Sequence, residues 1–317
     1  MSEKIKIGII GLGMVGTPIK RWFEEVRGYK RGQDLFCYDT DPKMGYFDDV
    51  NNADVIFVAV PTPPNPDGSC NISIVDNALS RLAGHKIVVI KSTIPPGTTE
   101  MFQQKYPRWR ILFNPEFLTE SRAWEDFLHP TRQLIGYTEK SKGDSAIVLN
   151  LLPQGNFSSP WAADYSRFEL TATEAEFVKY FSNVFGAVKV TLANIFYDVC
   201  EAMSKQSELD VDYENIRTAV GADPRIGPSW LDVHHGVCRG YTGFCFPKDM
   251  NGFIAFGEQL VRGSRDGAIQ TALLSCGVDG VLSAVRRYNT ALLMSQNRTE
   301  EDVSKHDKDI TLKKEEL

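Results

Sequence analysis

The chain has 317 residues, of which 42% are hydrophobic and 24% are charged, and its 35 basic and 41 acidic side chains give a formal net charge of −6. This composition excludes collagen-like, low-complexity and wholly disordered chains. The mildly acidic balance excludes the broad positive field of a nucleic-acid-binding protein. No segment approaches the roughly 18 apolar residues of a membrane span, so we expect no membrane partner.

Short apolar segments predict strands throughout the first half of the chain. Five of them lie at residues 4–10, 34–39, 54–60, 86–92 and 110–114. Most are near-continuous apolar runs, as parallel strands covered on both faces require. Helical or loop segments separate them, which is the βαβ pattern of a doubly wound, Rossmann-like α/β sheet. A further strand is expected at 131–137 and a helix at 145–152.

A change of composition near Thr171 predicts one very long helix. The segment that follows has no proline for more than 30 residues, and its only glycine is Gly186. Thr173 followed by Glu176 fits a capping box at the start of this helix. Apolar residues recur at helical spacing at Phe177, Phe181, Val184, Phe185 and Val188. This pattern indicates that the helix has packing faces. Such a length favours a helix that links two lobes.

The rest of the chain predicts a second, helical domain and a charged end. A loop rich in Gly, Pro and His covers 221–247, and a further helical region extends to about Met294. We therefore expect a Rossmann-like domain over 1–168, a helical central domain over 169–295, and a disordered tail over 296–317.

The cysteines and the N-terminus favour a reducing cytoplasm. The six cysteines are scattered and form no CxxC pair, and a chain of this length needs no disulfide scaffold. The start MSEKIKIGII predicts a first strand rather than a signal peptide. No metal centre is expected.

Three glycines follow the first predicted strand in the pattern of a dinucleotide-binding loop. Gly11 would allow the tight turn, Gly13 would let a pyrophosphate approach the backbone, and Gly16 would let helix and strand pack closely. The helix N-terminus would offer free N–H groups to the phosphates. Asp39 lies 23 residues after Gly16, at the end of the second strand, where a carboxylate binds ribose hydroxyls and repels a 2′-phosphate. NAD is therefore the expected cofactor.

Further reactive side chains follow the later strands and the long helix. Thr93 ends the fourth strand, and Glu116 and Glu120 follow the fifth, at the sheet edge where α/β folds bind ligands. Lys179 and Asn183 lie one helical turn apart. Each has an ordinary structural alternative, but together with a cysteine they suit oxidation of an alcohol through a thioester.

The sequence resembles the UDP-glucose/GDP-mannose dehydrogenase family, NAD-dependent enzymes that oxidise the 6-hydroxyl of a nucleotide sugar to a uronic acid. The matching motifs are IIGLGMVG, VPTPPNPDGS, KSTIPPGT, NPEFLTE with A-x-x-D-F-x-x-P-x-R, AEFVKYFSN, DPRIG and FCFPKD. They occur in family order up to about residue 290. The family's third, nucleotide-closing domain has no counterpart here, so we expect a short form or a fragment.

The resemblance assigns site residues motif by motif. It implies a catalytic set of Cys245 as nucleophile, Lys179 and Asn183 as oxyanion donors, and Thr93, Glu116, Glu120 and Asp249 for water and proton transfer. It implies NAD contacts from Gly11, Gly13, Met14, Val15, Gly16, Asp39, Lys43, Val60, Pro61, Thr62, Thr93 and Glu120. It implies substrate contacts from Glu116, Phe117, Leu118, Lys179, Asn183, Arg225, Gly240, Tyr241, Gly243 and Cys245.

Three functions remain open on the sequence. The first is four-electron oxidation of a nucleotide sugar, with UDP-glucose favoured, as in polysaccharide biosynthesis. The second is a two-electron dehydrogenase acting on a smaller hydroxy compound, and the third is a non-catalytic protein that binds NAD or a nucleotide. In each case the long apolar-striped helix favours a homodimer through the central helices.

Overall fold

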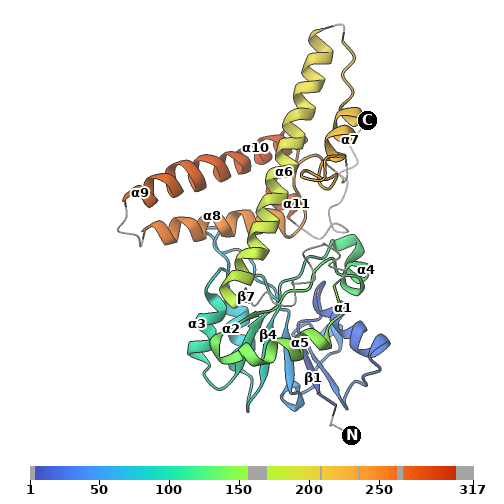
Figure 1. The fold of residues 1–317 in the computed structure, drawn as a ribbon, viewed down its shortest axis with the longest axis vertical. Coiled ribbons are helices and arrows are strands. Elements are labelled where there is room, and N and C mark those ends of the chain that lie inside the picture. Colours follow the sequence, from blue (N-terminus) through green and yellow to red (C-terminus); the bar gives the residue numbers. More distant parts are fainter. Residues whose placement is uncertain are drawn as a thin grey trace. The chain divides into compact units, whose positions relative to one another are not determined.

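The computed structural model describes residues 4–155, 170–207, 209–234, 236, 238–262 and 267–304. The chain divides into two compact units (Figure 1). The first comprises Met1–Pro63 and Cys70–Lys179, and the second comprises Pro64–Ser69 and Tyr180–Leu317. None of the helices in the described ranges is long and apolar enough to cross a membrane.

The first unit contains a seven-stranded sheet in the order β2-β1-β3-β4-β5-β6-β7. The strands from β1 to β5 are parallel, and β6 joins antiparallel to β5. The strand bounds are β1 Ile7–Ile10, β2 Leu35–Tyr38, β3 Val55–Val58, β4 Ile87–Ile90, β5 Arg110–Phe113, β6 Gly136–Tyr137 and β7 Leu170–Thr171. The five strands predicted in the first half are confirmed, with shorter ends. The order reverses between β1 and β3, which is where doubly wound sheets bind ligands.

The sixth predicted strand is wrong over most of its length. Of residues 131–137, only Gly136 and Tyr137 pair in the sheet. The Asn114 side-chain amide donates to the Leu134 carbonyl at 2.6 Å and to Gln133 Oε1 at 3.0 Å. The bond to Leu134 occupies a backbone carbonyl that a strand would use to pair with its neighbour, so the strand does not extend over this residue.

Helices cover both faces of the sheet, because alternate strand residues point to opposite sides. Ile56 and Val58 of β3 pack under α2 and α3, whereas Val55 and Phe57 pack under α1 and α5. In Figure 1, α2 and α3 lie on one side of the strands and α1 and α4 on the other. The helix bounds are α1 Gly16–Arg21, continued by the π-helix η1 Trp22–Val26, then α2 Ser73–Ser80, α3 Thr98–Lys105, α4 Ala123–Leu128 and α5 Ser145–Leu151. The helix predicted at 145–152 is confirmed as α5.

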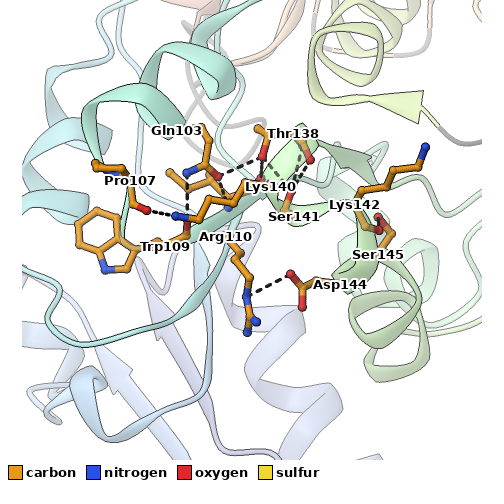
Figure 2. Close-up of polar contacts among 11 residues, drawn as sticks. Gln103, Pro107, Trp109, Arg110, Thr138, Lys140, Ser141, Lys142, Asp144 and Ser145 are labelled. Atoms are coloured by element: carbon orange, nitrogen blue, oxygen red, sulfur yellow. Dashed lines mark hydrogen bonds and ion pairs between the residues drawn. The ribbon is translucent and has the colours of Figure 1, made fainter.

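A buried polar network fixes β5 against its neighbours (Figure 2). The Gln103 amide bridges β5: its Nε2 donates to the Trp109 carbonyl, and its Oε1 accepts from the Ile111 N–H, both at 2.9 Å. Thr138 Oγ1 also donates to Gln103 Oε1, and Ser141 Oγ donates to the Ile111 carbonyl at 2.7 Å. Since buried polar groups are costly unless paired, this network fixes the beginning of β5, at Trp109 and Ile111.

The long helix predicted after Thr171 is confirmed as α6, Ala172–Gln206, with 35 residues. Its capping box, however, lies two residues before the predicted pair. The Thr171 N–H and hydroxyl donate to Glu174 Oε2, and the Glu174 N–H donates back to Thr171 Oγ1. Glu176 is fully buried and instead accepts hydrogen bonds from Gly97 and Thr99. Glu176 therefore caps α3 rather than its own helix.

The second unit is helical and is built around α6. Its helices are α7 Tyr213–Gly221, α8 Phe246–Arg262, α9 Gly267–Ile269, the π-helix η7 Gln270–Leu282, α10 Ser283–Met294 and α11 Glu300–Val303. Figure 1 shows α8 beside the rod formed by α9 and α10. One side of α6 packs on this pair through Val184 and Ala187, and further along it packs near α7 through Ala193 and Cys200. The helical region predicted up to Met294 is confirmed.

The described part of the predicted tail is ordered, so that prediction is wrong for residues 296–304. Thr299 and Asp302 form a capping box for α11. Val303 is fully buried, and its carbonyl accepts a hydrogen bond from Gly243. The charged composition concealed this single buried anchor. Residues 305–317 lie outside the described residues.

Candidate active site

The glycine loop connects β1 to α1, and its three glycines have different surroundings. Gly11 has φ +87°, and a Cβ there would lie 2.6 Å from the Ala59 carbonyl oxygen. A Cβ on Gly16 would lie 1.8 Å from the Gly11 oxygen, whereas nothing lies within 4 Å of a Cβ on Gly13. The protein's own packing therefore requires Gly11 and Gly16, and the open space at Gly13 fits a phosphate approaching the backbone. Residues 14–15 of the loop are half-buried.

Asp39 directly follows β2 and holds the glycine loop. Its Oδ2 accepts from the Leu12 N–H at 2.7 Å, and its Oδ1 accepts from the Asp41 N–H at 2.8 Å. Asp39 thus opens the following turn and also lies beside the loop. Its partly exposed carboxylate can face ribose hydroxyls from there. Lys43 lies exposed in the adjacent 3-10 turn η2, Pro42–Met44.

The loops after β3 and β4 meet at the same edge of the sheet. Val60, Pro61 and Thr62 follow β3, and Thr93 follows β4. Thr62 is buried, and its hydroxyl donates to the Thr93 carbonyl at 2.8 Å. The structure therefore brings the predicted nicotinamide-side loop against the predicted water-positioning threonine. β3 lies next to β1, which carries the glycine loop, and β4 lies on the other side of β3.

Lys179 and Glu116 form a buried ion pair in the first unit. The Lys179 ammonium donates to Glu116 Oε1 and to the Glu116 carbonyl, both at 2.8 Å. Both side chains are buried, and the Lys179 charge holds the pKa of Glu116 below its ordinary value although burial acts to raise it. Glu116 Oε2 also accepts from the Leu118 N–H, and the Phe117 ring lies 5.7 Å from Lys179 Nζ.

Lys91 belongs to the same cluster, and sequence reasoning missed it. Its ammonium is buried at the end of β4 and donates to Asn114 Oδ1 at 2.6 Å. Burial lowers the pKa of Lys91 to about 8, with opposing influences from the charges of Glu116 and Lys179. A lysine directly after a fully apolar strand was the available signal, since such a position at a ligand-binding edge is rarely left to solvent.

Cys245 directly precedes α8 in the second unit. Its carbonyl accepts the Asp249 N–H at 2.8 Å, in the first turn of that helix. Cys245 is of intermediate exposure, so it is not sealed in the interior. The partial positive charge at a helix N-terminus favours a thiolate over a thiol. This helix start was not predicted from the sequence.

Asp249, in the first turn of the helix that follows Cys245, forms a second buried pair with Asn183 of α6. Asn183 Nδ2 donates to Asp249 Oδ2 at 2.5 Å, and the Lys248 ammonium pairs with the other carboxylate oxygen. Asp249 is fully buried and Asn183 nearly so. The carboxylate thus neutralises Lys248 and orients the Asn183 amide.

The other predicted substrate residues lie in different settings. Arg225 is 87% exposed and its guanidinium bonds to Asp223. Tyr241 is buried, while Gly240 and Gly243 have positive φ values of 100° and 80°. Glu120 begins the 3-10 turn η4, Glu120–Arg122, and is half-buried.

Two family models match the chain. The NAD-binding domain of the UDP-glucose/GDP-mannose dehydrogenase family matches residues 42–151, and the central domain of the same family matches residues 173–265. NAD is accordingly the cofactor of the first unit, and the glycine loop and Asp39 fit it.

Similar proteins support the same family. The chain is 29% identical to a putative UDP-glucose 6-dehydrogenase of Bacillus subtilis over 287 residues, covering 78% of this chain and 62% of that protein. It is 34% identical to a UDP-glucose 6-dehydrogenase of Pseudomonas aeruginosa, over 66% of this chain and 45% of that protein. The chain thus spans less than two thirds of the length of these relatives.

A solved structure agrees in fold over most of the chain. The UDP-glucose dehydrogenase of Pyrobaculum islandicum superposes with a TM-score of 0.65 and 28% identity, covering 93% of this chain and 72% of that one. On the sheet order, the glycine loop and the two matched domains together, this chain belongs to the UDP-glucose/GDP-mannose dehydrogenase family.

Proposed function

We propose that this protein oxidises the C6 hydroxyl of a nucleotide sugar, with UDP-glucose favoured, to the uronic acid by a four-electron route through Cys245. The observation that carries the proposal is the placement of Cys245 directly before α8, with the buried pair of Asp249 and Asn183 in the same unit. A binding protein needs no thiol at a helix N-terminus, whereas covalent catalysis does. The first unit is proposed as the NAD-binding domain, and the second as the domain that carries the thiol.

The chain's own residues supply the groups that such a route needs. NAD⁺, when bound, supplies the hydride acceptor for both oxidations. After the alcohol has become an aldehyde, the Cys245 thiolate would add to its carbon and give a thiohemiacetal. The oxyanion would then accept hydrogen bonds from Lys179 and Asn183.

A second oxidation of the thiohemiacetal leaves a thioester on Cys245. Water would then hydrolyse the thioester and release the acid and the thiol. Thr93, Glu120 and Asp249 are proposed to orient that water and to accept its proton. Glu116, through its contact with Lys179, would keep the ammonium charged and in place.

The substrate is proposed from the relatives. The proteins of Bacillus subtilis and Pseudomonas aeruginosa bear the name UDP-glucose 6-dehydrogenase, and the former covers most of this chain. Arg225 and the segment from Gly240 to Gly243 are proposed to bind the nucleotide sugar. The exposure of Arg225 leaves its guanidinium accessible to a phosphate. A role in making sugar acids for polysaccharides follows from the same proposal.

A homodimer through α6 is part of the proposal. Large apolar side chains on this helix are exposed in the second unit: Phe181, Phe185, Leu192, Phe196, Val199 and Met203. They recur at steps of three, four or seven residues, which is the pattern of a helix seam. We refer to these six residues as the α6 stripe and propose that a second copy of the chain covers it. A cytoplasmic location agrees with the six cysteines, all of them among the described residues, because none forms a disulfide.

A spectrophotometric assay with a panel of nucleotide sugars tests the function. Two NADH per molecule of UDP-sugar consumed support the four-electron route, and one NADH with a stable carbonyl product contradicts it. NAD binding without reduction on any sugar would point to a binding protein. Cys245→Ser should stop formation of the acid while NAD binding persists, and unchanged turnover by this variant would refute the covalent step.

A further inference from the structure

The segment before Cys245 is held by two side-chain amides, Asn289 in α10 and Gln296 just after that helix. The Tyr241 N–H donates to Asn289 Oδ1 at 2.8 Å, and Asn289 Nδ2 donates to the Tyr241 carbonyl at 3.1 Å. Two residues earlier, the Arg239 N–H donates to Gln296 Oε1 at 2.8 Å, and Gln296 Nε2 donates to the Arg239 carbonyl at 3.2 Å. We call these two contacts the amide brackets. Each one satisfies both polar groups of a residue's backbone, as a neighbouring strand would.

A third attachment continues the same alternation. The Gly243 N–H donates to the Val303 carbonyl at 2.9 Å. Residues 239, 241 and 243 are thus each fixed from the C-terminal part of the chain. Backbone groups that lose these partners inside the protein would remain unpaired, which is costly.

The residues of the Asn289 bracket are buried and closely packed on the loop side as well. Asn289 is 3% exposed and Tyr241 is 2% exposed. Gly240 has φ +100°, and a Cβ there would lie 2.6 Å from Asn289 Oδ1. Only glycine fits between the two bracketed residues. On the other side of Cys245, the Phe246 ring occupies the space that a Cβ on Gly186 would fill.

We propose that Asn289 and Gln296 are positioning residues that hold the loop so that Cys245 stays at the N-terminus of α8. This inference rests on the proposed function, since it takes Cys245 as the nucleophile. Both residues bond to the backbone of the loop, at Tyr241 and Arg239. Their loss should therefore lower the rate of the chemical step and leave NAD binding unchanged, because the glycine loop belongs to the first unit.

Asn289→Leu and Gln296→Leu test the brackets one at a time. Since a small misplacement of a reacting group can cost about 10²-fold in rate, we expect kcat to fall by about that factor in Asn289→Leu and by less in Gln296→Leu. The KM for NAD should stay at the wild-type value. Thr290→Val is the matched control, because it removes only a bond within α10, from Thr290 Oγ1 to the Arg286 carbonyl. Wild-type kcat in both leucine variants overturns the proposal.

Gly240→Ala approaches the same bracket from the loop. If the alanine acts by displacing Asn289 Oδ1, the double variant Gly240→Ala/Asn289→Leu should be no slower than the slower single variant. Because Gly240 is also proposed to contact the substrate, the comparison is made on the rate at which iodoacetamide alkylates Cys245, and additive losses in that rate would overturn the bracket.

Alkylation of the thiols keeps the test independent of turnover. With iodoacetamide and site-resolved mass spectrometry, Cys245 should react several-fold more slowly in Asn289→Leu than in the wild type, because a loosened loop moves the thiol from the helix N-terminus. The exposed Cys276 is the internal reference. An unchanged or faster reaction of Cys245 overturns the proposal. If the wild type forms no NADH, the proposed function fails while this measurement still decides the positioning role.

Discussion

The Glu176 carboxylate, in the second turn of α6, accepts hydrogen bonds from the backbone N–H and the hydroxyl of Thr99 at the start of α3, at 2.8 and 2.6 Å. It also accepts the Gly97 N–H at 2.6 Å. Burial nevertheless outweighs these bonds and raises the pKa of Glu176 from 4.5 to about 7. The start of α6 is therefore joined to the sheet domain by a group that titrates near neutrality.

The first prediction concerns the effect of pH on stability. Because the folded-state pKa of Glu176 is raised, its favourable contribution to the free energy of unfolding is complete below pH 4.5 and is lost as the pH rises through about 7. A shift of this size corresponds to roughly 3 kcal/mol. Glu176→Gln cannot ionise, so its free energy of unfolding, measured with urea, should fall less than that of the wild type over this range. A constant difference between the two proteins would contradict the burial argument.

The second prediction concerns the buried pair of Glu116 and Lys179. Glu116→Ala removes the carboxylate that faces a buried ammonium, and breaking such a pair costs about 3–5 kcal/mol. The double variant Glu116→Leu/Lys179→Met should recover most of the lost free energy of unfolding while producing no uronic acid. The control is Glu25→Ala, which breaks an exposed pair with Arg21 and should change stability little. If Glu116→Ala and Glu25→Ala lose equal amounts of the free energy of unfolding, the buried pair stabilises the protein no more than the exposed pair does.

The third prediction concerns cofactor affinity and choice. Asp39→Ala removes the acceptor of the Leu12 N–H, and bonds to a charged group contribute roughly 1.5–3 kcal/mol. NAD affinity, measured by calorimetry, should fall by about tenfold or more. NADP binding should fall less, because the carboxylate that repels a 2′-phosphate is gone. Asp39→Asn keeps one acceptor oxygen and should lie between. An unchanged ratio of the two affinities would exclude Asp39 from ribose recognition.

The fourth prediction concerns the contact between Gly186 and Phe246. A methyl group at residue 186 would lie 2.6 Å from Phe246 Cζ, and overpacking of this kind costs about 1–3 kcal/mol. Gly186→Ala should lower both the melting temperature and the rate of NADH formation, although alanine favours helix formation. Gly267→Ala in α9 is the control, because nothing lies within 4 Å of its Cβ. If both alanine variants behave alike, the ring is not confined by Gly186.

The fifth prediction concerns the α6 stripe. Phe185 and Phe196 are 54% and 60% exposed, and a charge at either residue should disrupt a self-complementary apolar seam. Phe185→Lys and Phe196→Lys are expected to shift the mass measured by light scattering from the dimer to the monomer. Leu260→Lys is the control, since Leu260 is 52% exposed on α8, outside the stripe. A wild-type protein that is already monomeric would refute the proposed dimer.

The strands of the sheet were predictable from the sequence because a strand that is buried on both faces consists almost entirely of apolar residues. The run at 54–60 has alternate residues in opposite cores, so nearly every residue must be apolar. Polar contacts between residues far apart in the chain produce no such pattern in the sequence. Glu176 matched a capping motif for α6, yet its partners lie 77 and 79 residues away in the chain.

The candidate site was predictable in its residue types but not in its pairings. Motifs identified Lys179 and Asn183 as a pair, and the structure gives each a different carboxylate partner, Glu116 and Asp249. Lys91 escaped notice because a single polar residue after an apolar strand has no periodicity, and Asn289 because it lies shortly after two arginines in a helix where a further polar residue is ordinary. Their importance depends on neighbours that only the folded chain supplies.

The hydrogen bond from Gly243 to Val303 also has a practical consequence. The backbone that leaves α10 returns within ten residues to the loop before the thiol, so a force applied just beyond residue 304 would be transmitted to that loop. Affinity tags, fusion partners and surface immobilisation are therefore better attached before β1, in the unit that carries the glycine loop. A fluorophore placed close to α11 would, for the same reason, report on movement of the loop at Gly243.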